Sequence, residues 1–203
     1  VLEEDRGVDV AVGHPGLDVD VGAQLVEQEH HRLRPRRARG VRGQGLAGLA
    51  IGSFLNVVIH RVPLMMERAW KLDSAETLGV TVDAPALITL STPRSRCPSC
   101  GHAISWYENI PVLSYAWLRG RCSACKTHIS ARYPLVELFT GALFAAIGWK
   151  FGAVPAALLW CGFAAVLVAL TGIDWDTTLL PDSLTLPLLW AGLVASALGW
   201  TIP

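Results

Sequence analysis

The chain has 203 residues, 52% of them apolar, with a mean hydropathy of +0.40 and a formal net charge of zero. Such a composition argues against an ordinary soluble domain and favours a membrane protein with several spanning helices. We therefore expect an all-α polytopic membrane protein, with the lipid bilayer as a partner and no nucleic acid.

Residues 1–44 differ from the rest of the chain. They contain no Lys and no aromatic residue, and they are rich in Val, Asp, Gly and Arg. We expect a disordered basic tail here. The alternative is a mistranslated segment, read from the wrong start or frame of a gene. Neither interpretation assigns the segment a function.

Residues 45–60 are apolar up to Ile59, a run too short for a complete span of about 17–25 residues. We interpret them as part of a first transmembrane helix, which His60, Arg61 and Pro63 are expected to end. Gly48 and Gly52 are four residues apart, a spacing that lets a second helix approach closely. The spacing alone is a weak signal.

Residues 61–132 are polar and interrupted by prolines, and they contain two Cys-x-x-Cys pairs, Cys97/Cys100 and Cys122/Cys125. Two such pairs typically complete a closed, structural zinc site. Disulfides are the alternative. The segment carries more Lys and Arg than acid, which favours the reducing, cytosolic side. The sequence therefore predicts a small cytosolic zinc-binding loop domain.

Residues 133–203 are predicted to form three more transmembrane helices, at 133–152, 153–173 and 183–203. Asp174, Asp176 and Asp182 lie between the last two of these helices. Acidic residues at the end of a spanning segment are costly, and are candidates for function. If the cysteine loop is cytosolic, the alternation of spans puts Asp174 on the same side. We interpret Glu137 as a residue that interacts with the helix dipole at the start of its span, and the alternative is a role in the site.

Four segments together resemble the bacterial type IV prepilin peptidases. They are Gly52–Pro63 (GSFLNVVIHRVP), the two cysteine pairs, Arg132–Glu137 (RYPLVE) and Ile173–Asp182 (IDWDTTLLPD), in the order and spacing of that family. The resemblance runs from about residue 46 to the last residue. It implies a multi-pass inner-membrane enzyme, with the cysteine loop and Asp174 facing the cytosol.

The resemblance also implies an activity. Such an enzyme cleaves the basic leader from type IV prepilins or type II secretion pseudopilins, alongside the pilus or secretion assembly machinery. It then methylates the new N-terminal residue with S-adenosylmethionine. Asp174 matches the first of two catalytic aspartates, and Asp176 and Asp182 are expected to support it. The second aspartate lies in a Gly-x-Gly-Asp motif that these residues lack, so we expect half of a protease site.

Two less specific interpretations stay open. The three aspartates could form a hydrophilic loop between two helices and nothing more. The whole chain could be a non-catalytic, membrane-anchored zinc module or an assembly partner. The sequence shows no Gly-rich nucleotide-binding motif, so it identifies no residues that bind the methyl donor.

Overall fold

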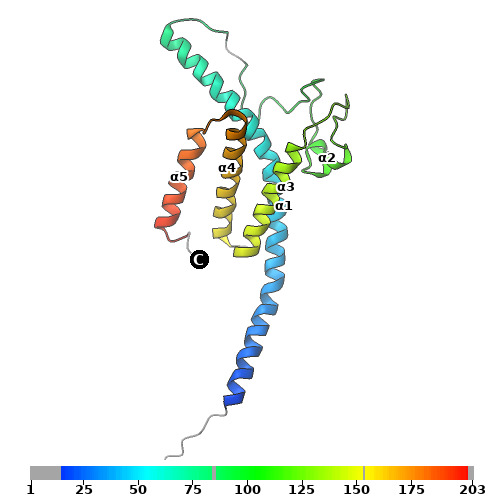
Figure 1. The fold of residues 1–203 in the computed structure, drawn as a ribbon, viewed down its shortest axis with the longest axis vertical. Helices are drawn as coiled ribbons and strands as arrows, with labels where there is room; N and C mark the ends of the chain where they lie inside the picture. Colours follow the sequence, from blue (N-terminus) through cyan, green and yellow to red (C-terminus); the bar gives the residue numbers. More distant parts are fainter. Residues whose placement is uncertain (1–14, 84–85, 153, 201–203) are drawn as a thin grey trace, which may run out of the picture. The chain divides into compact units, whose positions relative to one another are not determined.

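The computed structural model describes residues 15–83, 86–152 and 154–200. Two isolated antiparallel bridges, and no strand, accompany the helices in these ranges. The helices are α1 (Pro15–Leu78), the 3-10 turn η1 (Trp106–Asn109), α2 (Leu113–Trp117), α3 (Arg132–Phe151), α4 (Pro155–Thr177) and α5 (Asp182–Ala197) (Figure 1). The expected all-α class is confirmed. Residues 1–36 form one compact unit and residues 37–203 another, and the site lies in the second.

Three helical segments are long and apolar enough to cross a membrane: Gly40–Leu78, Arg132–Phe151 and Pro155–Thr177. They correspond to the first three predicted spans. The fourth prediction, 183–203, was too long. Helix α5 ends at Ala197 after 16 residues, which gives a length of about 24 Å against a hydrocarbon core of about 30 Å. Residues 201–203 lie outside the described part.

Helix α1 departs from two expectations. It begins at Pro15, so the described part of segment 1–44 is helical rather than disordered; residues 1–14 lie outside the described ranges. It also continues through Pro63 to Leu78, although we expected it to end there. Pro63 removes one backbone hydrogen bond, but Val58 and Ile59 on the preceding turn are buried. Their packing holds the helix together across the proline.

Helices α1 and α3 meet through glycines. A Cβ atom built on Gly48 would lie 2.8 Å from the Cα atom of Gly141, and one built on Gly52 would lie 2.7 Å from the Cα atom of Glu137. No real Cβ atom tolerates these distances from backbone. The two helices therefore approach closely at Gly48 and Gly52, and glycine is required at both positions.

A substitution of Gly48 by Ala is expected to push the two helices apart. Gly→Ala inside a helix normally stabilises by up to about 1 kcal/mol, but overpacking at this contact should destabilise by about 1–3 kcal/mol. Thermal unfolding in detergent micelles measures the difference. The matched control is Gly162→Ala in α4, where an added Cβ meets nothing within 4 Å. Equal effects of the two substitutions would contradict the close packing.

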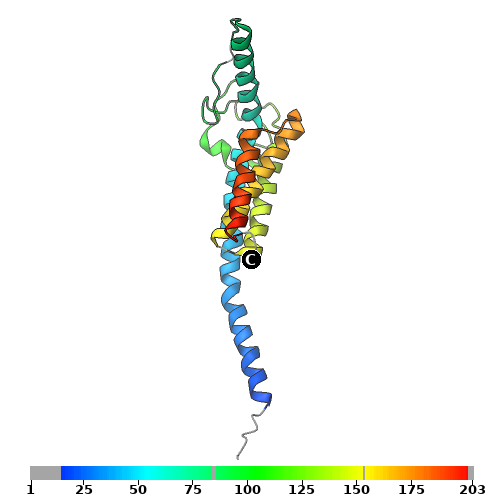
Figure 2. The ribbon, with the colours of Figure 1, turned by 90° about the vertical axis from the view of Figure 1, so that its left-hand side faces the viewer.

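Helices α3, α4 and α5 follow one another side by side (Figures 1 and 2). Leu55 and Val58 of α1 form a buried cluster with Ala169 of α4. At the start of α3, Arg132 forms an ion pair with Asp176 near the end of α4, with 2.6 Å between Nη1 and Oδ1. The last turn of α4 therefore lies at the end of α3 that follows the cysteine loop, as the alternation of spans predicted.

Candidate metal centre and membrane-border carboxylates

The two Cys-x-x-Cys turns, 97–100 and 122–125, fold in the same way. In each turn the amide of the first cysteine donates to the carbonyl of the residue five positions later, at 2.9 Å in both turns. The carbonyl of the first cysteine accepts from the amide of the residue four positions later, at 2.9 Å in the first turn and 3.1 Å in the second. That fourth residue has a left-handed backbone, with φ of 71° at Gly101 and 62° at Lys126. An antiparallel bridge closes each turn. The folded loop thus presents two equivalent knuckles.

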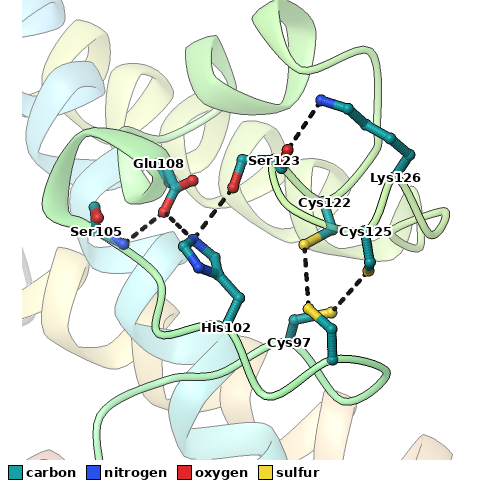
Figure 3. A network of polar contacts seen from close by, with 9 residues as sticks. Cys97, His102, Ser105, Glu108, Cys122, Ser123, Cys125 and Lys126 are labelled. Atoms are coloured by element: carbon teal, nitrogen blue, oxygen red, sulfur yellow. Dashed lines mark hydrogen bonds and ion pairs between the residues drawn. The ribbon is translucent and has the colours of Figure 1, made fainter.

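The four cysteine sulfurs converge on one point (Figure 3). All four Sγ atoms lie within 4.8 Å of one another. The Sγ atoms of Cys97 and Cys125 are 3.7 Å apart, and those of Cys100 and Cys122 are 4.0 Å apart. Four thiolates bound tetrahedrally at about 2.3 Å would be separated by about 3.8 Å, whereas a disulfide needs about 2.05 Å. All four cysteines are free, so the arrangement fits a metal ion and not the disulfide alternative.

The surroundings of the cysteines favour ionisation of two of them. The hydroxyl and the amide of Thr127 lower the pKa of Cys125 to about 6. The amides of Cys100 and Ser99 lower the pKa of Cys97. The pKa of Cys100 is raised to about 11, because desolvation and the neighbouring thiols outweigh a favourable amide of His102. Thiolates are the form that binds a metal, so the lowered pKa values of Cys97 and Cys125 favour that form.

A buried carboxylate connects the two knuckles. The side chain of Glu108 is 7% exposed, and its Oε2 accepts from the amide of Ser105 at 2.7 Å. The same oxygen lies 3.3 Å from Nε2 of His102, which also lies 3.2 Å from Oγ of Ser123 (Figure 3). His102 follows the first cysteine pair, and Ser123 lies within the second. The network therefore fixes one knuckle relative to the other, while His102 stays outside the sulfur cluster.

Substituting Glu108 by Gln is expected to change how stability depends on pH. The Ser123 hydroxyl, the Ser105 amide and His102 lower the pKa of Glu108 from 4.5 to about 2. A lowered pKa stabilises the fold above pH 4.5, and that stabilisation is lost as the pH falls towards 2. Glu108→Gln should therefore cost about 1–2 kcal/mol near neutral pH and less at low pH.

The measurement is chemical unfolding of both proteins across this pH range. The difference between their free energies of unfolding cancels the contribution of cysteine protonation, because both proteins have the same cysteines. The control is Glu76→Gln, an exposed position on α1. A difference that stays constant with pH would contradict the role of the Glu108 carboxylate.

Three buried polar side chains make long-range contacts: two join a helix to the loop, and one joins α1 to α3. Asn56 donates to the carbonyl of Tyr133 at 3.1 Å. Arg61 donates to two loop carbonyls, those of Thr89 and Pro93, at 2.7 and 2.6 Å. Glu137 accepts from the amide of Val112 at 2.7 Å. The sequence analysis missed these contacts. Glu137 lies beyond the first turn of α3, so its assignment to the helix dipole was wrong.

The three aspartates take separate positions. Asp174 is exposed in the last turn of α4, which runs to Thr177, so it lies on the helix and not after it. Asp176 is paired with Arg132. Asp182 is the first residue of α5, and Pro181 is the N-cap. In the described ranges the cysteines are the one group of three or more metal-type ligands. A carboxylate in a last helical turn opposes the helix dipole, at a cost of about 0.3–1 kcal/mol.

Two families of proteins match the chain. Residues 46–151 match the bacterial peptidase A24 N-terminal domain, and residues 161–203 match the type IV leader peptidase family. The first match alone covers more than half of the chain. It contains all four cysteines of the sulfur cluster, and the second contains the three aspartates.

Several curated relatives carry the name prepilin leader peptidase/N-methyltransferase. One from Burkholderia pseudomallei is 55% identical over 155 residues, which are 75% of this chain and 50% of the relative. One from Pseudomonas putida is 48% identical over 77% of this chain and 54% of its own length. One from Neisseria gonorrhoeae is 48% identical over 77% of this chain and 55% of its own length.

The chain thus spans about half the length of the curated relatives it matches. No solved structure matches it. The two family matches cover the sulfur cluster, the membrane-border aspartates and most of the helices from residue 46 onward. The chain therefore belongs to the bacterial A24 peptidase family, that of the prepilin leader peptidase/N-methyltransferases.

Proposed function

We propose that this chain forms part of an enzyme that removes the leader of type IV prepilins or type II secretion pseudopilins and methylates the new N-terminus. The observation that carries the proposal is Asp174, an exposed carboxylate in the last turn of a membrane-spanning helix. The names of the relatives support the substrate class. The enzyme would sit in the inner membrane, with the cysteine loop and Asp174 towards the cytosol.

Peptide-bond cleavage by carboxylates needs two of them. One is ionised and takes a proton from the attacking water; the other is protonated and polarises the scissile carbonyl. Asp174 supplies one of these groups. Asp176 is already neutralised by Arg132, and Asp182 begins a different helix. The resemblance implies that the second carboxylate comes from a Gly-x-Gly-Asp sequence, which these 203 residues do not contain.

The position of Asp174 suits the proposed substrate. A prepilin carries a short basic leader, followed by an apolar stretch that enters the membrane. A carboxylate at the end of α4 meets the junction between these two parts. Asp182 at the start of α5 adds a second negative charge near a basic leader, while the charge of Asp176 is held by Arg132.

The sulfur cluster is proposed to bind structural Zn²⁺. Cys97, Cys100, Cys122 and Cys125 provide four thiolates at distances that suit tetrahedral coordination. With all four positions taken by protein, the ion would hold the two knuckles together and leave no open position for substrate. The residues of the loop, and not the ion, would then face the substrate.

S-adenosylmethionine is the methyl donor that the resemblance implies. The two cavities described for this chain do not fit it well. One, of about 390 Å³, is lined mainly by the end of α1, and the other, of about 480 Å³, is lined by Arg42 and otherwise apolar residues of α1 and α3. Neither presents the Gly-rich turn at a helix N-terminus that typically binds a nucleotide. We derive no methyl-transfer step from these residues.

The test is to express the gene, extended to include a Gly-x-Gly-Asp sequence, together with a pseudopilin carrying a basic leader. Mass spectrometry of the pseudopilin N-terminus then reads leader loss and the added methyl group separately. Loss of the leader supports the peptidase. An unprocessed pseudopilin, in membranes where the enzyme is inserted and zinc-loaded, would leave the non-catalytic zinc module as the better description.

A further inference from the structure

One face of the cysteine loop is apolar and exposed. It consists of Trp106 and Tyr107 of η1 and Leu113 and Trp117 of α2, which we call the aromatic edge. These side chains are 78%, 57%, 67% and 88% exposed. Exposed aromatic residues gathered in this way mark a surface that contacts something apolar. Neither the sulfur cluster nor the aspartates account for them.

Helix α2 has two different faces. Leu113 and Trp117 are four residues apart, so they share one face of the helix. Tyr115 lies on the other face, where its hydroxyl donates to the carbonyl of Ile129 at 3.2 Å and its ring packs against Gly120. The inner face is therefore fixed to the loop, and the outer face has no partner in the described ranges.

A hydrogen bond fixes the height of this face along α3. The amide of Val112, just before α2, donates to the Glu137 carboxylate at 2.7 Å. Glu137 comes five residues after Arg132, the first residue of α3, or about 7.5 Å further along the helix axis. At that height α3 is already inside its apolar span. The aromatic edge therefore starts at the level of the spanning segment and not above it.

Exposed apolar residues of α3 and exposed arginines after α2 also suit a membrane surface. Along the same part of α3, Leu135, Leu138 and Phe139 are exposed, as expected for side chains that face lipid. Immediately after α2, Arg119 and Arg121 are also exposed. Arginines beside an apolar surface suit the phosphates of lipid headgroups. Trp and Tyr are the residues that concentrate at the boundary between headgroups and acyl chains.

We propose that the aromatic edge lies in the headgroup–acyl boundary of the bilayer that α3 spans. There it holds the cysteine module against the membrane surface. The apolar rings bury among the upper acyl chains, and Arg119 and Arg121 face the phosphates. This anchor is independent of the proposed peptidase activity, because it rests on the spanning helix α3 and on the loop geometry alone.

Depth-dependent fluorescence quenching tests the proposal. The zinc-loaded protein, with Trp117 as its single tryptophan and Phe at the others, is placed in vesicles of phosphatidylcholine and phosphatidylglycerol. The lipids carry nitroxides at shallow or deep acyl positions. The matched control keeps Trp70 alone, a half-exposed residue of α1 nine residues beyond Arg61. Shallow nitroxides are expected to quench Trp117 several-fold more than they quench Trp70. Deep nitroxides are expected to quench Trp117 less than shallow ones do. Equal quenching of both by aqueous iodide, with none by lipid, would overturn the proposal.

A second measurement keeps the natural tryptophans. Trp117→Asp is expected to raise amide hydrogen exchange over residues 106–121 several-fold in vesicles, while the zinc content stays unchanged. Leu87→Asp, at another exposed loop position, is the control and should have no such effect. Unchanged exchange in Trp117→Asp would count against the anchor. Protection that rises with the ratio of protein to lipid would also overturn it, since it would indicate contact with a second copy.

Discussion

Leader cleavage is expected to fall by at least about 10³-fold when Asp174 is replaced by Asn in a chain that also carries the Gly-x-Gly-Asp sequence. Asn keeps the shape of the side chain but cannot take up or release a proton, and positioned acid–base groups contribute about 10²–10⁴-fold each. The side chain is exposed, with no hydrogen bond or ion pair in the described ranges. Folding and membrane insertion should therefore be unaffected.

The assay is cleavage of a purified prepilin-like substrate, with insertion checked by carbonate extraction of membranes. Asp182→Asn is the matched control: it removes an exposed carboxylate from the start of the next helix, and cleavage is expected to fall by less than about tenfold. Normal processing by the Asp174→Asn enzyme would refute the catalytic assignment. An equal loss in both variants would point instead to binding of the basic leader by the group of aspartates.

Replacing Cys97 by Ser is expected to release the metal and unfold the loop. Structural zinc sites in small domains contribute about 10–16 kcal/mol of apparent binding free energy, much more than any single contact described here. A serine hydroxyl does not replace a thiolate at neutral pH, so the ion would lose one of its four ligands. Metal analysis of the purified protein gives the zinc content, and limited proteolysis reports the order of residues 86–131.

The matched control is Cys161→Ser. Cys161 is buried in α4 and does not belong to the sulfur cluster. This variant should keep one zinc per chain and the same loop fragments on proteolysis. If Cys97→Ser also kept its metal and its resistance to protease, the four sulfurs would not be the ligands. Chelation of the unsubstituted protein should reproduce the effect of Cys97→Ser.

Much of the architecture could be read from local patterns. The two cysteine pairs predicted a four-sulfur site, because two Cys-x-x-Cys turns typically complete one, and the four sulfurs do converge. The apolar runs 133–152 and 153–173 predicted helices, because a helix satisfies its backbone within the segment in lipid, and α3 and α4 lie there. The spacing of Gly48 and Gly52 allowed the close approach to α3 but did not by itself predict it.

Long-range polar contacts could not be predicted in this way. The partner of Asn56 is 77 residues away, those of Arg61 are 28 and 32 residues away, and that of Glu137 is 25 residues away. No local pattern specifies partners at such separations. The signal that could have found them is a polar residue within an apolar run. Pro63 was misleading for a related reason, because tertiary packing outweighs its local tendency to end a helix.

The length of α1 has a mechanical consequence. Its candidate span, Gly40–Leu78, has 39 residues, or about 58 Å, roughly twice the thickness of the hydrocarbon core. The helix is therefore long enough to continue from lipid into water. Arg61 of this helix also donates hydrogen bonds to the loop that precedes the first knuckle. A thinner or thicker bilayer changes the tilt of a spanning helix, and a rigid arm about 28 Å long converts a 10° change of tilt into a movement of about 5 Å at its tip.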